Sequence, residues 1–159
     1  MKLLRYRLNN EVKPGILDLE NKIRNASSLV DDWNNKTINI DKLNSLNSSD
    51  LSSLPIVEKI DSIAPCLSKE SIGKFICIGL NYADHAEETG QQVPPEPIIF
   101  FKATSAVVGP NDDIEIPKNS TKSDWEVELG VIIGKETKYI NENESQSHIA
   151  GYCVVNDLS

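Results

Sequence analysis

The sequence predicts an α+β fold that is dominated by strands and contains only short helices. From residue 71 onward, dense β-branched and apolar runs alternate with Gly and Pro turn signals, which is the pattern of short strands. No βαβ rhythm with helices of a dozen residues is present, and no glycine-rich phosphate loop follows a strand. A doubly wound, nucleotide-binding sheet is therefore disfavoured.

Residues 1–65 are expected to form a small N-terminal lobe with two short strands, a turn and a helical segment. The strands are centred on residues 3–6 and 16–19, and Leu43 and Leu46 share one face of the helical segment. This region contains no His and no carboxylate cluster with the spacing of a site. We expect it to be a structural or docking lobe.

Residues 71–159 are expected to form the first portion of a second, larger domain. In chain order the pattern predicts a strand at 75–78, a short helix at 81–88, a strand at 98–101, a turn at 109–112, and strands at 125–133 and 149–155. The run at 75–78 is continuously apolar, which is typical of a strand that is covered on both faces.

Composition and charge exclude some classes of partner. The chain has 159 residues with a net charge of −8, and its Lys and Arg form no block, so nucleic acid and anionic membranes are not expected partners. No apolar run approaches the roughly 20 residues of a membrane span, and the first residues lack a secretory pattern. We expect a cytoplasmic protein. If its substrate is an organic acid, a bound cation would supply the positive centre that an acidic protein lacks.

The three cysteines, Cys66, Cys77 and Cys153, are widely spaced and form no CxxC pair. This pattern is typical of reduced thiols in a reducing compartment, and we expect most of them to be buried.

Glu126 and Glu128 form the most informative pattern in the chain. Successive side chains on a strand point to opposite faces, so these two carboxylates share one face while Trp125, Val127 and Leu129 share the other. Side by side, the carboxylates repel each other unless a cation lies between them, and oxygen ligands suit Mg²⁺, Mn²⁺ or Ca²⁺ rather than Zn²⁺. The same alternation is also typical of an ordinary solvated strand face.

Asp157 is a candidate third oxygen ligand. It follows the apolar run at 152–155, where the end of a strand can present a side chain to a cleft. An Asn-Asp pair after a strand is also a common turn signal, so this residue alone leaves both alternatives open.

Four segments carry a resemblance to a known family: FICIGLNYADH (75–85), PIIFFKATS (97–105), DWEVELG (124–130) and GYCVVND (151–157). In this order they resemble the motif blocks of the fumarylacetoacetate hydrolase family. The resemblance is specific over residues 71–159. Residues 1–60 more loosely resemble the N-terminal lobe of bacterial members named as diketo-deoxy-fuconate hydrolases and ureidoglycolate lyases. The resemblance to this family implies a fold of mixed β-sheets that form a β-roll or sandwich. It also implies that the C-terminal part of the core lies beyond Ser159.

The resemblance also implies the residues of a site. Glu126, Glu128 and Asp157 match the family's metal ligands for Mg²⁺ or Mn²⁺, with Ca²⁺ as an alternative. His85 and Glu88 match its catalytic dyad, and a spacing of three on a helix lets the carboxylate orient the imidazole. The residues expected to bind substrate are Tyr82, Lys102, Thr104 and Ser105. His148 matches no motif and is expected at the surface.

The implied activity is hydrolysis of a carbon–carbon bond in a 2-oxo or 1,3-diketo acid, such as a 2,4-diketo-3-deoxy sugar acid. In this scheme the cation polarises a carbonyl and stabilises the enolate that leaves, while His85 takes a proton from the attacking water. Lyases, isomerases and decarboxylases of the same fold share the enolate step. Two alternatives remain: a non-catalytic fragment or assembly module, and a structural Ca²⁺ site. The resemblance implies a homodimer for the full-length protein.

Overall fold

The computed structural model describes all residues from 1 to 159, and the chain folds into two compact units. Unit 1 comprises residues 1–68 together with 108–159, and unit 2 comprises residues 69–107. Unit 1 contains β1 (Lys2–Leu8), β2 (Glu11–Leu17), β3 (Ile23–Asn25), α1 (Ile40–Asn47), β4 (Ser62–Ala64), β7 (Val127–Ile133), the 3-10 helix η3 (Glu142–His148) and β8 (Ile149–Asn156). Unit 2 contains η1 (Lys69–Ser71), β5 (Phe75–Gly79), α2 (Ala83–Glu88), β6 (Ile98–Lys102) and η2 (Thr104–Ala106). The strand-dominated α+β class is confirmed.

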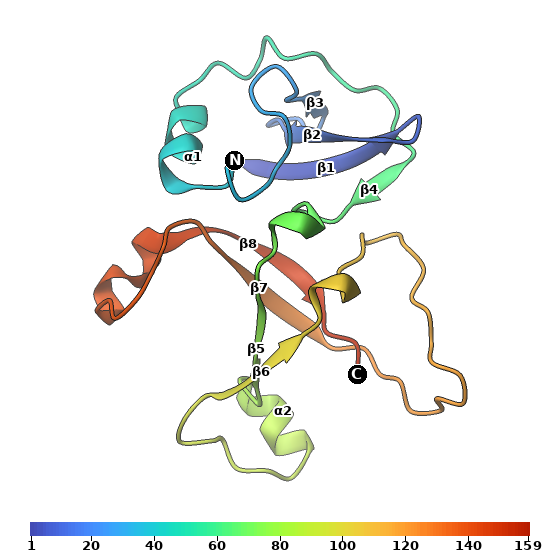
Figure 1. The fold of residues 1–159 in the computed structure, drawn as a ribbon, viewed down its shortest axis with the longest axis vertical. Coiled ribbons are helices and arrows are strands. Elements are labelled where there is room, and N and C mark those ends of the chain that lie inside the picture. The colour runs from blue at the N-terminus through green and yellow to red at the C-terminus, as the bar shows by residue number, and fades with distance from the viewer. The chain divides into compact units, whose positions relative to one another are not determined.

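A four-stranded antiparallel sheet begins unit 1, in the order β3-β2-β1-β4 (Figure 1). Leu8 pairs with Glu11, so only Asn9 and Asn10 join β1 to β2, and both have positive φ angles of 54° and 64°. Two positive φ angles are the requirement of the tight hairpin turn that follows the twist of the strands, and Asn tolerates this conformation better than most residues. The two predicted strands and the turn into Ile23 are confirmed.

The hydrophobic core of unit 1 joins β2 of this sheet to segments between residues 26 and 54. Its buried members are Ile16, Ala26, Val30, Trp33, Leu46 and Leu54. Trp33 is completely buried, and its indole N–H donates to the carbonyl oxygen of Gly15 at 3.1 Å, so its polar atom is satisfied inside the core.

Helix α1 covers the core with one face. Asn39 caps it, because its side-chain oxygen accepts from the backbone N–H of Lys42 at 2.9 Å, and Ser48 ends it. Leu43 and Leu46 are its buried residues, as the sequence predicts.

Two arginines of β1 fasten other segments of unit 1. Arg5 is buried and forms a two-pronged ion pair with Asp32, with both N···O distances at 2.7 Å. Arg7 forms a similar pair with Asp112 at 2.7 and 2.8 Å. Asp112 also closes the predicted turn at 109–112, because its backbone N–H donates to the Gly109 carbonyl at 3.1 Å.

Strands β7 and β8 form a two-stranded antiparallel ribbon in unit 1 (Figure 1). Val127 pairs with Asn156 and Ile133 with Ile149, with one irregularity between Ile132 and Ile133. Both predicted strands are present, although β7 begins at Val127 rather than at Trp125.

Unit 2 consists of the β5–β6 hairpin, the short helix α2 and the flanking 3-10 turns. Phe75 pairs with Lys102 and Gly79 with Ile98, so the two predicted strands are present and antiparallel. The expectation that residues 75–78 are covered on both faces is wrong for this chain, because Ile76 and Ile78 are exposed.

Buried apolar side chains are confined to one region of the chain. Apart from Ala86, every one of them lies between Leu4 and Pro65. Residues 108–159 contain no buried apolar side chain and expose a series of large ones. None of the helices has the length and apolar character of a membrane span.

Two expectations from the sequence are corrected. His148 is buried rather than at the surface, and its Nδ1 lies 3.0 Å from the Glu144 carbonyl oxygen, within η3. The cysteines are not mostly buried, since Cys66 is exposed and the other two are half-buried, and no disulfide joins them. Both errors have the same cause: burial depends on segments that are distant in the sequence.

Candidate functional site

The site residues expected from the sequence fall into two groups, one in each unit. Glu126, Glu128 and Asp157 lie on or beside the β7–β8 ribbon of unit 1. The remaining expected residues, all in unit 2, are Tyr82, His85, Glu88, Lys102, Thr104 and Ser105.

The register of the ribbon brings the three carboxylate residues onto one face. Because Val127 pairs with Asn156, Glu126 lies opposite Asp157, and the Asp157 N–H donates to the Glu126 carbonyl oxygen at 2.8 Å. Residues directly opposite on antiparallel strands share a face, and so do residues two apart on one strand. Glu128 therefore joins Glu126 and Asp157 on this face, which we call the carboxylate face.

Asp157 is held firmly although β8 ends at Asn156. Beyond it, Asp124 and Ser159 exchange two backbone hydrogen bonds of 2.7 and 3.0 Å. The Asn156 side chain also accepts from the backbone N–H of Glu126 at 3.1 Å. These bonds extend the ribbon past the last strand residue and fix the position of the Asp157 backbone.

The carboxylate face is the more covered face of β7. Glu126 and Glu128 are half-buried, whereas the alternating residues Trp125, Val127 and Leu129 are 70%, 64% and 57% exposed. An ordinary solvated strand face would show the opposite distribution, with its carboxylates in water and its apolar side chains covered. The arrangement disfavours that alternative for Glu126 and Glu128.

The donor set fits a hard divalent cation in its chemistry. All three side chains offer only carboxylate oxygens, which Mg²⁺, Mn²⁺ and Ca²⁺ prefer. No group of three or more His, Cys, Asp or Glu side chains stands close enough together in this structure to hold an ion. The assignment of Glu126, Glu128 and Asp157 as metal ligands thus stays a prediction.

Gly130, in β7, stands at a position where a side chain would not fit. Its partner across the ribbon is Cys153, and a Cβ at position 130 would lie 2.7 Å from the Cys153 sulfur and 2.7 Å from the Val155 Cγ2 atom. Real Cβ atoms do not approach other atoms so closely, and a side chain here would displace both neighbours.

Helix α2 carries the expected acid–base pair. His85 is half-buried and Glu88 is exposed one turn later, with Tyr82 at the N-cap. The helix ends at Thr89, whose hydroxyl donates to the His85 carbonyl at 2.9 Å. No hydrogen bond or ion pair joins the His85 and Glu88 side chains in this structure. The dyad assignment stays a prediction.

The other residues expected to contact substrate follow one another at the end of β6. Lys102 is the last residue of this strand and is half-buried opposite Phe75. Thr104 and Ser105 begin the 3-10 turn η2, which the backbone bond from Ala106 N–H to the Ala103 carbonyl closes at 2.9 Å. Three polar side chains thus cluster within four residues of chain.

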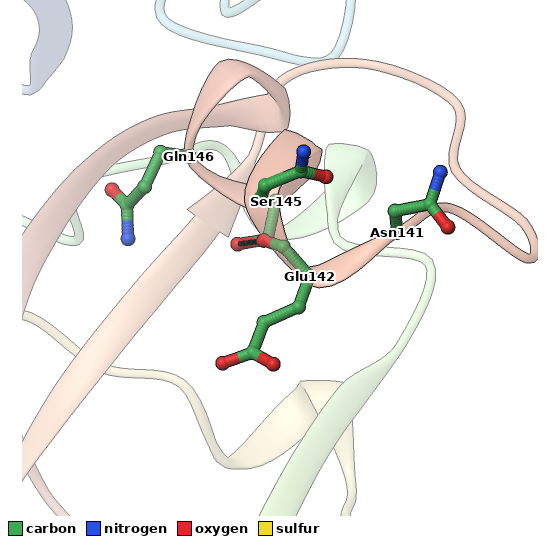
Figure 2. Close-up of a pocket in the computed structure, with 5 residues that line it drawn as sticks. Asn141, Glu142, Ser145 and Gln146 are labelled. Atoms are coloured by element: carbon green, nitrogen blue, oxygen red, sulfur yellow. Dashed lines mark hydrogen bonds between the residues drawn. The ribbon is translucent and has the colours of Figure 1, made fainter.

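A shallow surface hollow lies at the 3-10 helix η3. The lining residues are Asn141, Glu142, Asn143, Ser145 and Gln146. Figure 2 shows their side chains spreading in different directions from the helix rather than converging. None of the expected site residues belongs to this hollow, and it carries no functional assignment.

Comparison with known proteins gives a consistent match. Residues 74–159 match the family model described as fumarylacetoacetate (FAA) hydrolase C-terminal. A protein of Burkholderia ambifaria, named only provisionally as a hydrolase, is 50% identical over 159 residues, which are 100% of this chain and 56% of the relative. The chain thus spans little more than half the length of the curated relatives it matches.

Solved structures show the same fold. A fumarylacetoacetate hydrolase from Exiguobacterium antarcticum superposes with a TM-score of 0.81 at 25% identity, covering 100% of this chain and 56% of that one. A maleylpyruvate hydrolase from Sphingobium sp. SYK-6, in complex with manganese(II) and pyruvate, superposes with a TM-score of 0.77 at 20% identity, covering 99% and 58%.

Proposed function

Since the chain belongs to the fumarylacetoacetate hydrolase family, we propose that it provides the metal ligands and acid–base residues of a divalent-metal-dependent hydrolase. The substrate class is a 2-oxo or 1,3-diketo acid, whose carbon–carbon bond is cleaved. A 2,4-diketo-3-deoxy sugar acid is the specific candidate. Neighbours with the same fold support this proposal, since one of them is a fumarylacetoacetate hydrolase and another is a maleylpyruvate hydrolase with bound manganese(II) and pyruvate.

The observation that carries the proposal is the half-buried carboxylate face. Glu126, Glu128 and Asp157 would hold Mg²⁺ or Mn²⁺, because like charges on a partly covered strand face need a cation to offset their repulsion. A bound cation of this kind supplies Lewis acidity toward a carbonyl oxygen of the substrate.

The residues of unit 2 would act on protons and on the acid group of the substrate. His85 would accept a proton from water at an imidazole nitrogen, with Glu88 stabilising the charged ring. Lys102 would pair with a substrate carboxylate, while the Thr104 and Ser105 hydroxyls and the Tyr82 phenol can donate hydrogen bonds to its oxygens.

The ligand assignment is tested by substitution and metal titration. The double variant Glu126→Gln, Glu128→Gln keeps size and hydrogen-bonding atoms but removes two charges, so bound Mn²⁺ should be lost. Glu142→Gln, an exposed glutamate on η3, is the matched control and should bind Mn²⁺ normally. Unchanged Mn²⁺ content in the double variant would refute the assignment.

The catalytic assignment is tested separately by turnover. With Mg²⁺ or Mn²⁺ present, His85→Ala should lose activity toward a panel of 2-oxo and diketo acids by about 10²–10⁴-fold while still binding metal. Activity that survives this substitution would contradict the acid–base role. Loss of turnover while metal binding persists would also exclude the alternative of a purely structural cation site.

The reaction class is the finer part of the proposal. Lyases, isomerases and decarboxylases of this fold would use the same residues, and the products released from the panel distinguish them from a hydrolase. If no acid in the panel is consumed by the metal-loaded protein, the alternative of a non-catalytic module is favoured. Size measurement in solution tests the expected homodimer.

A further inference from the structure

An open groove lies on one face of the N-terminal sheet, and the proposed reaction uses none of its residues. The groove has a volume of about 380 Å³, which falls within the range of roughly 300–1,000 Å³ that is typical of pockets for small molecules. Its lining residues come from β1, β2, the end of β3 and the segment before β4: Tyr6, Leu8, Lys13, Asn25 and residues 55–59.

The register of the sheet places three side chains of the groove together. Tyr6 on β1 pairs with Lys13 on β2, and Leu8 follows two residues after Tyr6. Residues that lie directly opposite each other, or two apart on one strand, share a face of the sheet. Ile16 of the hydrophobic core points to the other face, since three residues separate it from Lys13 along β2. The groove is therefore separate from the core.

The segment before β4 forms a wall of the groove. The Val57 N–H donates to the carbonyl oxygen of Ile23 on β3 at 2.8 Å. The Asp61 N–H donates to the carbonyl oxygen of Arg7 on β1, also at 2.8 Å. Because β2 lies between these two strands, residues 58–60 cross over the sheet, and they do so on the side of the groove, which two of them line.

Tyr6 offers an unused polar atom to the groove. Its ring is buried, and its hydroxyl takes part in no hydrogen bond. Every side-chain nitrogen or oxygen that is closed off from solvent has a partner, so the hydroxyl is the part of Tyr6 that reaches the groove. Burial raises the pKa of Tyr6 above its ordinary value of 10.0, against the charge of Lys13, so this hydroxyl is a proton donor at neutral pH.

Other polar groups of the groove are also hydrogen-bond donors. Lys13 is half-buried and gives one N–H to Glu11 at 2.9 Å, which leaves two donors on its ammonium group. Glu11 itself is 67% exposed, so water screens its charge. The Asn25 Oδ1 atom accepts from the backbone N–H of Ser27 at 2.9 Å, so the amide nitrogen of Asn25 remains as a donor.

Charge and apolar surface together define a ligand for the groove. Two lysines and one glutamate line it, so their charges sum to +1 in a chain whose net charge is −8. Three aliphatic side chains lie beside them: Leu8, Ile56 and Val57. An anion with an apolar body complements both features, and a carboxylate can accept from two donors at once.

We propose that this groove binds a small carboxylic acid with an apolar body, whose carboxylate accepts hydrogen bonds from the Tyr6 hydroxyl and the Lys13 ammonium group. The apolar body of the ligand lies against the aliphatic side chains of the groove. This binding does not depend on the proposed metal-dependent reaction, because the two sites share no residue.

Titration of the full chain with benzoate, followed through its backbone amide signals by NMR, tests the proposal. Saturable shifts should appear at the amides of Tyr6 and Lys13, with a dissociation constant below about 10 mM, and not at Glu142 in the hollow at η3. Benzamide has the same ring without the charge. It should bind about tenfold more weakly, because hydrogen bonds to a charged group are the stronger ones.

Substitutions identify the groups that hold the carboxylate. Tyr6→Phe removes only a hydroxyl that has no partner within the protein, so benzoate should bind about tenfold more weakly while the melting temperature is not lowered. Lys13→Met removes the charge but keeps the apolar stem, and it should weaken binding to a similar degree. Lys22→Met is the matched control. Lys22 also pairs with a glutamate two residues earlier, Glu20 at 2.7 Å, but it does not line the groove, so binding should be unchanged.

Four results would overturn the proposal. The first is an absence of saturable shifts at Tyr6 and Lys13 with benzoate up to about 10 mM. The second is benzamide binding as tight as that of benzoate, and the third is normal benzoate binding by both groove variants. The fourth is a lowered melting temperature of Tyr6→Phe, which would mean that the hydroxyl is bonded within the protein. The first two results come from the unsubstituted chain and do not depend on the folding of any variant.

Discussion

At the scale of single residues, the two tryptophans lie in opposite environments. Trp33 is completely buried with a satisfied indole N–H, whereas Trp125 is 70% exposed. We expect Trp33→Ala to lower the free energy of unfolding by about 3–5 kcal/mol, because it removes a large core side chain and leaves a cavity. Trp125→Ala should change it by about 0.5 kcal/mol or less.

Urea unfolding followed by circular dichroism checks both values without relying on tryptophan fluorescence. If Trp33→Ala lowers the free energy of unfolding by less than about 1 kcal/mol, the core has collapsed around the missing ring. That result would contradict the expectation of a closely packed core.

Asp18 shows how one carboxylate organises a turn. It accepts from the backbone N–H groups of Glu20 and Lys22 at 2.9 Å each and from Arg24 Nε at 2.8 Å. These bonds lower the pKa of Asp18 below its ordinary value of 3.8, and the bond from the Lys22 N–H has the largest effect. The ionised form is thus favoured in the folded state.

The pH dependence of stability follows from the lowered pKa of Asp18. The stability that Asp18 contributes is complete above its ordinary pKa and is lost as the pH falls through the lower pKa of the folded state. Asp18→Asn should lower the melting temperature at about pH 7, and its difference from the unsubstituted chain should shrink toward about pH 2. A difference that stays constant over this range would contradict the role of the charge.

At the scale of elements, the β7–β8 ribbon contains two glycines with unequal surroundings. A Cβ at Gly130 would lie 2.7 Å from two side-chain atoms, while a Cβ at Gly151 would meet nothing within 4 Å. Gly130→Ala should destabilise the chain by about 1–3 kcal/mol through overpacking.

Gly151→Ala is the matched control on the partner strand. It should be neutral or stabilising by up to about 1 kcal/mol, because alanine restricts the unfolded chain more than glycine does. Thermal unfolding of both variants measures the contrast. Equal effects at the two positions would mean that the contact with Cys153 and Val155 imposes no constraint.

The ribbon also inverts the usual distribution of polarity. Its carboxylate face is half-buried and its apolar face, which includes Leu129, Val131 and Val154, is exposed. This inversion separates the carboxylates from an ordinary solvated strand and makes them the strongest candidates for a functional role in the chain.

At the scale of the whole molecule, stability is distributed unevenly. The buried apolar side chains lie between Leu4 and Pro65, with Ala86 as the exception. Strand β1 has hydrogen-bonded neighbours on both sides, whereas β5 and β6 pair only with each other. Local opening should therefore require most free energy in the N-terminal sheet.

Hydrogen exchange measures this distribution directly. We expect the amides of β1 and β2 to exchange slowest and those of β5 and β6 to exchange fastest, since the latter hairpin has no buried side chain on either strand. Exchange in β5 and β6 that is as slow as in β1 would contradict this order.

Much of the local structure could be predicted from the sequence because local rules decide it. Alternation placed Glu126 and Glu128 on one face of a strand, spacing placed Leu43 and Leu46 on the buried side of α1, and the turn at residues 109–112 formed as expected. Four ordered motifs also predicted the family that the comparison identifies.

What only the tertiary structure decided depends on contacts between segments far apart in the chain. The register of β7 and β8 brought Asp157 opposite Glu126, and the fold left the carboxylate face more covered than the apolar one. It also buried His148. Sequence periodicity determines which side chains share a face, but the packing of distant segments determines which face is covered and which side chains meet across it.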